Sequence, residues 1–188
     1  MVRKVSAAIL AGGFSSRMGK DKAALAFHGI TMLEHQVQKL RGLGIDDIMI
    51  SGSSIPVSDT RYIPDLYPHL GPLSGIHACL KAAKGESVLF LGVDVPLVPT
   101  EALRSLLSEH TKGITVLRHG DKTEPLIGIY DRALAEDCEI ILRSEKTAVK
   151  ELLDCAAVSF VLRHDNEILY TNCNTAQDYA KILEFDIS

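Results

Sequence analysis

The 188-residue sequence contains no tryptophan, and aromatic residues make up only 5% of it. Single-stranded nucleic acids are bound largely by stacking of bases on aromatic side chains, so this composition argues against such a surface. The chain also lacks a basic run, and its 24 acidic and 20 basic side chains give a net charge of −4. Because duplex binding normally needs a basic face, we expect no nucleic acid partner.

Long apolar segments are also absent, and no stretch approaches the roughly 20 apolar residues that a membrane-spanning helix needs. The apolar run near the N-terminus is about seven residues long and ends in glycines, which fits a buried strand better than a secretory signal. The cysteines, Cys79, Cys138, Cys155 and Cys173, show no C-x-x-C spacing, so neither a zinc ribbon nor a thioredoxin-type motif is present. We expect a soluble, cytoplasmic protein without membrane contacts, in which each cysteine is a reduced, small core residue.

What the sequence does contain is a regular alternation of apolar runs and amphipathic segments. Residues 5–11 (VSAAILA) form a continuous apolar run, which is typical of a strand covered on both faces. Thr31 and Glu34 form a capping box at the start of a helix that Gly42 or Gly44 ends. Strand–helix units of this length predict right-handed crossovers and a three-layer α/β domain with a mainly parallel sheet. Strands are expected at residues 5–11, 46–53, 61–65, 87–94 and 157–163, and helices at residues 31–44, 71–85 and 100–110 and from residue 176 onward.

After residue 113 this rhythm changes. Residues 113–131 resemble two strands joined by a polar turn at 119–122, which predicts an antiparallel excursion in the second half. A helical region over 131–154 is expected to break near Ser144, and Thr175 and Asp178 form the capping pair of the last helix. Because no repeat, low-complexity tract or linker is visible, we expect one domain over residues 1–188.

Polar residues follow the ends of several predicted strands. In open α/β sheets, ligands bind at the carboxyl ends of the strands, where the topology changes direction. That edge holds the loop after the first strand, residues 51–53, Asp65 and Asp94. We therefore expect these residues to converge on one site.

The loop after the first strand, LAGGFSSRMGKDKAAL (10–25), carries an excess of positive charge in an acidic chain. Its glycines, at 12, 13 and 19, match neither the Walker A spacing nor the dinucleotide fingerprint, and an acid follows Lys20 where Walker A needs Ser or Thr. Gly12 and Gly13 nevertheless let backbone N–H groups approach an anion closely, while Arg17 and Lys22 supply charge. A glycine pair after a strand is often a simple tight turn, but three cations within six residues favour a site for nucleoside triphosphate.

The same segment resembles the L-A-G-G-x-S-x-R-M-G-x-D-K signature of nucleotidyltransferases related to molybdenum cofactor guanylyltransferase. GPLSGI (71–76) is similar to that family's G-P-L-A-G-I, LGVDVPLV (91–98) to its apolar strand ending in D-x-P, and TNCNTAQDY (171–179) to its closing N-x-N-T-P-x-D segment. The resemblance implies a three-layer, Rossmann-like nucleotidyltransferase fold. It also implies an enzyme of molybdenum cofactor biosynthesis that transfers GMP from GTP to molybdopterin and releases pyrophosphate. The product, molybdopterin guanine dinucleotide, would serve molybdoenzymes or their chaperones.

This reaction requires positioning and charge neutralisation, since the attacking phosphate of the acceptor has its second pKa near 6 and needs no general base. A carboxylate at the end of an apolar strand is costly unless it is paired or bound to metal. Asp94 is therefore the expected Mg2+ ligand, as the corresponding family residue is. Lys22 and Arg17 would bind the triphosphate and, together with Asp94, form the catalytic set.

The resemblance implies further contacts, some of which have alternatives. Asp65 could accept hydrogen bonds from guanine, or it could be a turn residue after Pro64. Guanylyltransferases often carry Asn where this chain has Ser51, so CTP stays an alternative to GTP. Asn174 could meet the acceptor or cap the last helix. The implied nucleotide contacts are Leu10, Ala11, Gly12, Gly13, Lys22, Ser51, Asp65 and Asp94, and the implied acceptor contacts are Asn172 and Asn174.

Other functions also fit parts of this pattern. A cytidylyltransferase or a sugar-phosphate nucleotidyltransferase would share the fold, and a nucleotide-binding module without catalysis would share the loop. The complete set of Arg17, Lys22 and Asp94 argues against the module. The seven histidines show no metal-ligand spacing and are expected at the surface or in the core, with His77 on a helix whose start could present N–H groups to an anion.

Overall fold

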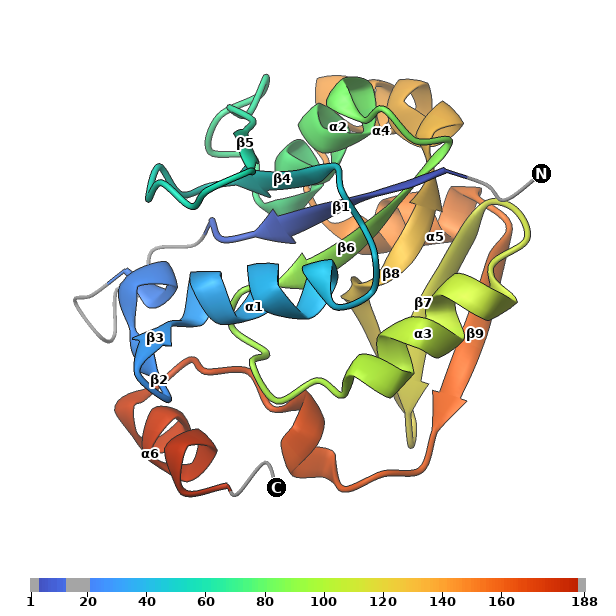
Figure 1. Ribbon diagram of the computed structural model, residues 1–188. Helices are drawn as coiled ribbons and strands as arrows, with labels where there is room; N and C mark the ends of the chain where they lie inside the picture. The colour runs from blue at the N-terminus through green and yellow to red at the C-terminus, as the bar shows by residue number, and fades with distance from the viewer. Residues whose placement is uncertain (1–3, 13–20, 186–188) are drawn as a thin grey trace.

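The computed structural model describes residues 4–12 and 21–185. Its centre is a seven-stranded sheet with the order β5-β4-β1-β6-β8-β7-β9 (Figure 1). Only β8 runs antiparallel to its neighbours, β6 and β7, which confirms a mainly parallel sheet with an antiparallel excursion in the second half. The strands are β1 Val5–Leu10, β4 Ile48–Ser51, β5 Arg61–Tyr62, β6 Ser87–Gly92, β7 Ile114–His119, β8 Lys122–Asp131 and β9 Val158–Arg163.

Helices cover both faces of this sheet, so the three-layer arrangement is also confirmed (Figure 1). One face packs against α1 and α3, and the other against α2, α4 and α5. A short hairpin, β2–β3, lies beside the last helix, α6 (Figure 1), and Tyr179 of α6 donates a 2.5 Å hydrogen bond to the carbonyl of Ala26 in β2. These elements are α1 Met32–Arg41, α2 Pro72–Ala82, α3 Thr100–Glu109, α4 Ala135–Arg143, α5 Val149–Cys155, α6 Ala176–Glu184, β2 Ala26–Phe27 and β3 Ile30–Thr31, with 3-10 turns η1 Lys22–Ala24, η2 Arg132–Leu134 and η3 Glu167–Tyr170.

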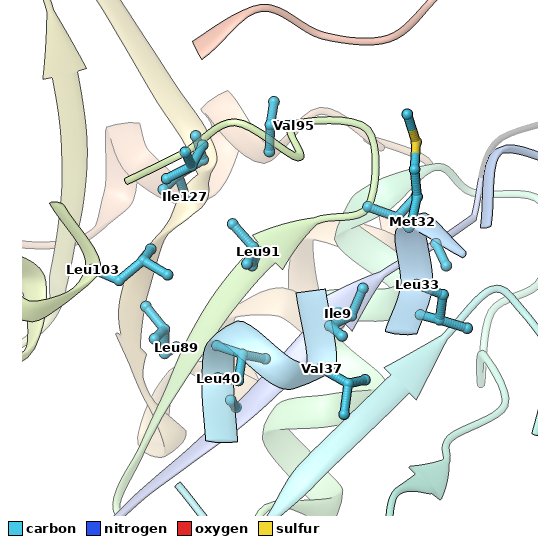
Figure 2. Packing of buried hydrophobic residues seen from close by; sticks show 14 of the residues in the cluster. Ile9, Met32, Leu33, Val37, Leu40, Leu89, Leu91, Val95, Leu103 and Ile127 are labelled. Carbon is cyan, nitrogen blue, oxygen red and sulfur yellow. The ribbon is translucent and has the colours of Figure 1, made fainter. Parts of the chain in front are cut away.

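Local sequence signals fix the start of α1. The Thr31 hydroxyl accepts from the Glu34 backbone N–H at 3.1 Å, and the Glu34 carboxylate accepts from the Thr31 N–H at 2.8 Å, which is the predicted capping box. The apolar stripe of α1 then lies over β1 and β6, as Figure 2 shows. Burial of each such aliphatic side chain stabilises the fold by about 1.5–3 kcal/mol. The fully buried members of the stripe are Met32, Leu33, Val37 and Leu40.

The cysteines only partly follow the sequence expectation. Cys79, Cys138 and Cys173 are buried, and burial raises their pKa values to about 12, 12 and 11. Cys155 is exposed, so the prediction that it is a core residue was wrong. It is the last residue of α5, a seven-residue helix that buries only Val149 and Leu152.

No helix in the described part of the chain combines the length and the apolar composition needed to cross a bilayer.

Candidate active site

A cleft of about 410 Å³ lies at the carboxyl ends of β1, β4 and β6. Gly12, Ser51, Asp65 and Asp94, which the sequence predicts to converge at this edge, all line it, and so does Lys22. The sheet order explains the convergence, because β4, β1 and β6 are adjacent and parallel. Their following loops therefore leave the sheet at the same edge.

One part of the cleft brings opposite charges together. Lys22 is the first residue of η1, which Asp21 caps by accepting a 2.9 Å hydrogen bond from the Ala23 N–H. The Lys22 ammonium lies 3.2 Å from Asp94 Oδ2, and the two side chains are 12% and 23% exposed. It also donates a 2.6 Å hydrogen bond to Asn174 Oδ1. A cation from the glycine-rich loop, the carboxylate after β6 and an amide of the C-terminal segment thus meet at one point.

The Asp94 carboxylate is positioned by the strand that precedes it. A side chain at Gly92 would place its Cβ 2.9 Å from Asp94 Oδ1, so the absence of a side chain there makes room for the carboxylate. The Asp94 carbonyl accepts a 2.7 Å hydrogen bond from the Cys173 N–H. This bond joins the turn after β6 to the segment that contains Asn174.

The side chain of Gln36, in α1, binds the backbone of the same turn. Its amide donates hydrogen bonds of 2.9 Å to the Gly92 carbonyl and 3.1 Å to the Val95 carbonyl. Gln36 is fully buried, and its own Oε1 has no hydrogen-bond partner in the described structure. A polar residue on an otherwise apolar helix stripe is the sequence signal for this role, although Gln36 was not predicted from it.

Two further side chains of α1 bind the end of the turn. Lys39 donates to the carbonyls of Pro96 at 2.8 Å and Val98 at 2.7 Å, and a ring nitrogen of His35 lies 3.0 Å from the Pro96 carbonyl. Burial lowers the pKa of Lys39 to about 7 and is also the main cause that lowers the pKa of His35 to about 4. Burial next to these carbonyls thus disfavours the charged form of both side chains.

A second group of residues lies where β4 and β5 end. The buried Ser51 hydroxyl donates a 2.8 Å hydrogen bond to Asp65 Oδ1 and so orients that carboxylate. A Cβ at Gly75, in the first turn of α2, would lie 2.6 Å from Ser51 Oγ, so glycine is needed for this close packing. Asp65 is therefore held by a specific contact as well as following Pro64 in the chain.

The loops after β1 and β4 touch through two glycines. Gly52 has φ of +85°, and a Cβ on it would lie 2.2 Å from the Gly12 nitrogen. No side chain can be accommodated at that distance, so glycine at 52 is required for the observed contact. The contact fixes the first described residues of the glycine-rich loop against β4.

Some predicted site residues lie elsewhere or outside the described chain. Gly13 and Arg17 fall outside the described residues, so the role of Arg17 stays a prediction. Neither Asn172 nor Asn174 lines the cleft, although Asn174 reaches the cleft residue Lys22, and the Asn172 carbonyl accepts a 3.0 Å hydrogen bond from the Asn174 N–H. The alternative that Asn174 caps the last helix was wrong, because Thr175 caps α6 and accepts from the Asp178 N–H at 3.1 Å.

The remaining predicted contacts behave as follows. Leu10 and Ala11 line the cleft, and their contact with a nucleotide stays a prediction. His77 is fully buried on α2, in agreement with a core histidine. His69 and Leu126 were not predicted as site residues, yet both line the cleft.

The donor set of the cleft determines which metal it could hold. Residues 4–12 and 21–185 contain no group of three or more His, Cys, Asp or Glu side chains arranged around a common point. The cleft instead offers the Asp94 carboxylate, and Mg2+ is usually held by one or two carboxylates, with phosphate oxygens and water completing its coordination. The cleft therefore fits a divalent cation that takes one ligand from Asp94 and further ligands from a bound phosphate.

The known proteins that this chain resembles belong to a family that fits the geometry of the cleft. Residues 7–163 match the family described as MobA-like NTP transferase domain. A probable molybdenum cofactor guanylyltransferase from Carboxydothermus hydrogenoformans is 34% identical, over 97% of this chain and 97% of that protein.

Solved structures share the fold at lower identity. Molybdopterin-guanine dinucleotide biosynthesis protein A from Archaeoglobus fulgidus has a TM-score of 0.79 at 23% identity and covers 95% of this chain and 97% of its own. A Mycobacterium tuberculosis protein, crystallised as a complex with manganese, has a TM-score of 0.74 at 15% identity and covers 98% of this chain and 100% of its own. From the matched domain and the extent of the sequence similarity, the chain belongs to the MobA-like NTP transferase family, among its molybdenum cofactor guanylyltransferases.

Proposed function

We propose that the chain transfers GMP from GTP to molybdopterin, with the triphosphate held between Lys22 and Asp94. The observation that carries this proposal is the 3.2 Å approach of the Lys22 ammonium to the Asp94 carboxylate inside the cleft. A triphosphate needs cations around its oxygens, and a carboxylate beside them is useful when a divalent cation bridges it to phosphate. The two side chains supply these two needs at one position.

Each residue has a distinct role in this proposal. Lys22 acts as a point charge on the phosphates, and Arg17 is predicted to bind them as a planar fork. Asp94 would hold Mg2+, which is usually bound by one or two carboxylates together with phosphate oxygens. When bound, the cation would offset negative charge on the triphosphate and on the departing pyrophosphate.

Selection of guanine is assigned to Asp65. Guanine presents two adjacent donors, an N1–H and an amino group, whereas cytosine presents only an amino group on its corresponding edge. A carboxylate accepts two such donors at once. Because the Ser51 hydroxyl occupies one direction at Asp65 Oδ1 and fixes the carboxylate, Ser51 acts here through Asp65. The backbone of Leu10, Ala11 and Gly12 would complete the nucleotide contacts.

The acceptor side is assigned to the C-terminal segment. Asn174 binds the Lys22 ammonium at 2.6 Å, so an acceptor phosphate that contacts Asn174 would lie beside the triphosphate. Asn172 would add a second amide contact from the same segment. The product would pass to molybdoenzymes or their chaperones in the cytoplasm.

The decisive experiment measures pyrophosphate release with molybdopterin, Mg2+ and each of GTP, CTP, ATP and UTP. We expect turnover with GTP, and preference for CTP would overturn the guanine assignment. Asp94→Ala should abolish turnover while the urea unfolding midpoint stays close to wild type. Asp154→Ala, an exposed carboxylate on α5, is the matched control and should retain full activity. Wild-type turnover in Asp94→Ala would remove the metal assignment.

A further inference from the structure

His69 supplies an aromatic ring to a cleft that otherwise has none among its described lining residues. It lies in the loop that joins β5 to α2, four positions after Asp65, and its side chain is exposed. In the described part of the chain, the imidazole has no hydrogen-bond or ion-pair partner. The ring is therefore available to a ligand in the cleft.

The backbone of His69 has a left-handed conformation in an anchored loop. Its φ is +68°, in the left-handed region that residues other than glycine rarely adopt. The flanking loop is anchored: the Tyr67 carbonyl accepts a 2.6 Å hydrogen bond from Ser74 Oγ, and the Tyr67 hydroxyl donates to Glu139 Oε1 at 3.3 Å. The anchored loop therefore holds His69 in place at the edge of the cleft.

The order of the strands indicates which part of the nucleotide reaches His69. The sheet runs β5-β4-β1-β6, so Asp94 after β6 and the β5–α2 loop lie at opposite sides of the cleft opening. If the triphosphate is bound between Lys22 and Asp94, the base extends towards Ser51, Asp65 and this loop.

We propose that the His69 imidazole stacks on the nucleobase of the bound nucleotide; this inference rests on the proposed function. Every base has a π-face, so stacking adds affinity with little discrimination between bases. His69 thus supplies affinity for the base, while the carboxylate of Asp65 reads its hydrogen-bonding edge.

The test compares two ligands on two matched variants of the full chain. His69→Asn removes the ring but keeps a residue type that tolerates left-handed backbone. His28→Asn makes the same change at an exposed residue with φ of +47° on the β2–β3 turn, outside the cleft lining. Binding of GTP and of inorganic tripolyphosphate, each with Mg2+, is measured by calorimetry, and KM and kcat are measured with GTP.

We expect His69→Asn to weaken GTP binding and to raise the KM for GTP by about five- to twenty-fold. Its kcat and its affinity for tripolyphosphate should match wild type, and His28→Asn should match wild type throughout. Unchanged GTP affinity in His69→Asn, or an equal loss for tripolyphosphate, would overturn the stacking proposal. If the wild-type chain itself fails to bind GTP, the proposed function fails first.

Discussion

Replacement of Gln36 by methionine tests how the Asp94 turn is held. Methionine has a similar length and removes both amide hydrogen bonds, those to the Gly92 and Val95 carbonyls at 2.9 and 3.1 Å. The Val95 carbonyl keeps a 3.3 Å hydrogen bond from the Val98 N–H, so the cost is two lost hydrogen bonds and the loss of a donor to the buried Gly92 carbonyl, together about 2–4 kcal/mol. The change also removes the unpartnered Gln36 Oε1, which returns about 1 kcal/mol. The free energy of unfolding should therefore fall by about 1–3 kcal/mol.

Urea unfolding followed by circular dichroism measures this loss, and Gln38→Met is the matched control. Gln38 lies on the exposed side of the same helix, so its substitution should change the free energy of unfolding by less than about 0.5 kcal/mol. Because the turn carries Asp94, Gln36→Met should also raise the Mg2+ concentration that gives half-maximal turnover, whereas Gln38→Met should not. If both variants unfold at the wild-type urea concentration and share its Mg2+ dependence, Gln36 has no part in positioning the turn.

Three other predictions follow from the geometry. Gly52→Ala should lower the free energy of unfolding in urea by about 2–4 kcal/mol, because its Cβ would lie 2.2 Å from the Gly12 nitrogen. Gly44 is the matched control: its φ is +77°, nothing lies within 4 Å of the position that a Cβ would take, and Gly44→Ala should cost only about 1 kcal/mol. Equal losses in the two variants would contradict the steric argument. Burial lowers the pKa of His35 from 6.5 to about 4, so the unfolded chain binds more protons than the folded chain between these pH values. The free energy of unfolding should therefore decrease as the pH falls through this window. His35→Phe should flatten that part of the plot of unfolding midpoint against pH, and an unchanged plot would exclude His35 as the cause. Iodoacetamide should modify Cys155 in the folded protein and all four cysteines after denaturation, as read by mass spectrometry; rapid labelling of another cysteine in the native state would contradict the buried positions.

Local patterns were sufficient to predict most of the elements. The caps of α1 and α6 are formed by residues three apart in the chain, so Thr31 with Glu34 and Thr175 with Asp178 could be recognised directly. The β2–β3 hairpin was missed because strands of two residues are too short to show alternation. A three-residue change of register between β7 and β8, which falls between Val116 and Leu117, was also missed because the apolar pattern of the two strands does not mark it.

The candidate site, too, could be predicted only in part. Lys22 and Asp94 were predicted from the topology and from family motifs, and the structure brings them together. The hydrogen bonds that hold the Asp94 turn could not be predicted, because Gln36 and Lys39 bind carbonyls 56 to 59 residues away in the sequence. His69 was missed for a related reason: its backbone conformation depends on the anchored loop around it.

The hydrogen bond between the Cys173 N–H and the Asp94 carbonyl completes a closed ring of contacts. From Asp94 the path runs to Cys173, along the chain to Asn174, across to Lys22 and back to the Asp94 carboxylate. Residues linked in a ring do not respond independently, so paired substitutions in it should depart from additivity by about 0.5–3 kcal/mol. A substitution at Asn174 should therefore also change the position of the Lys22 ammonium relative to Asp94.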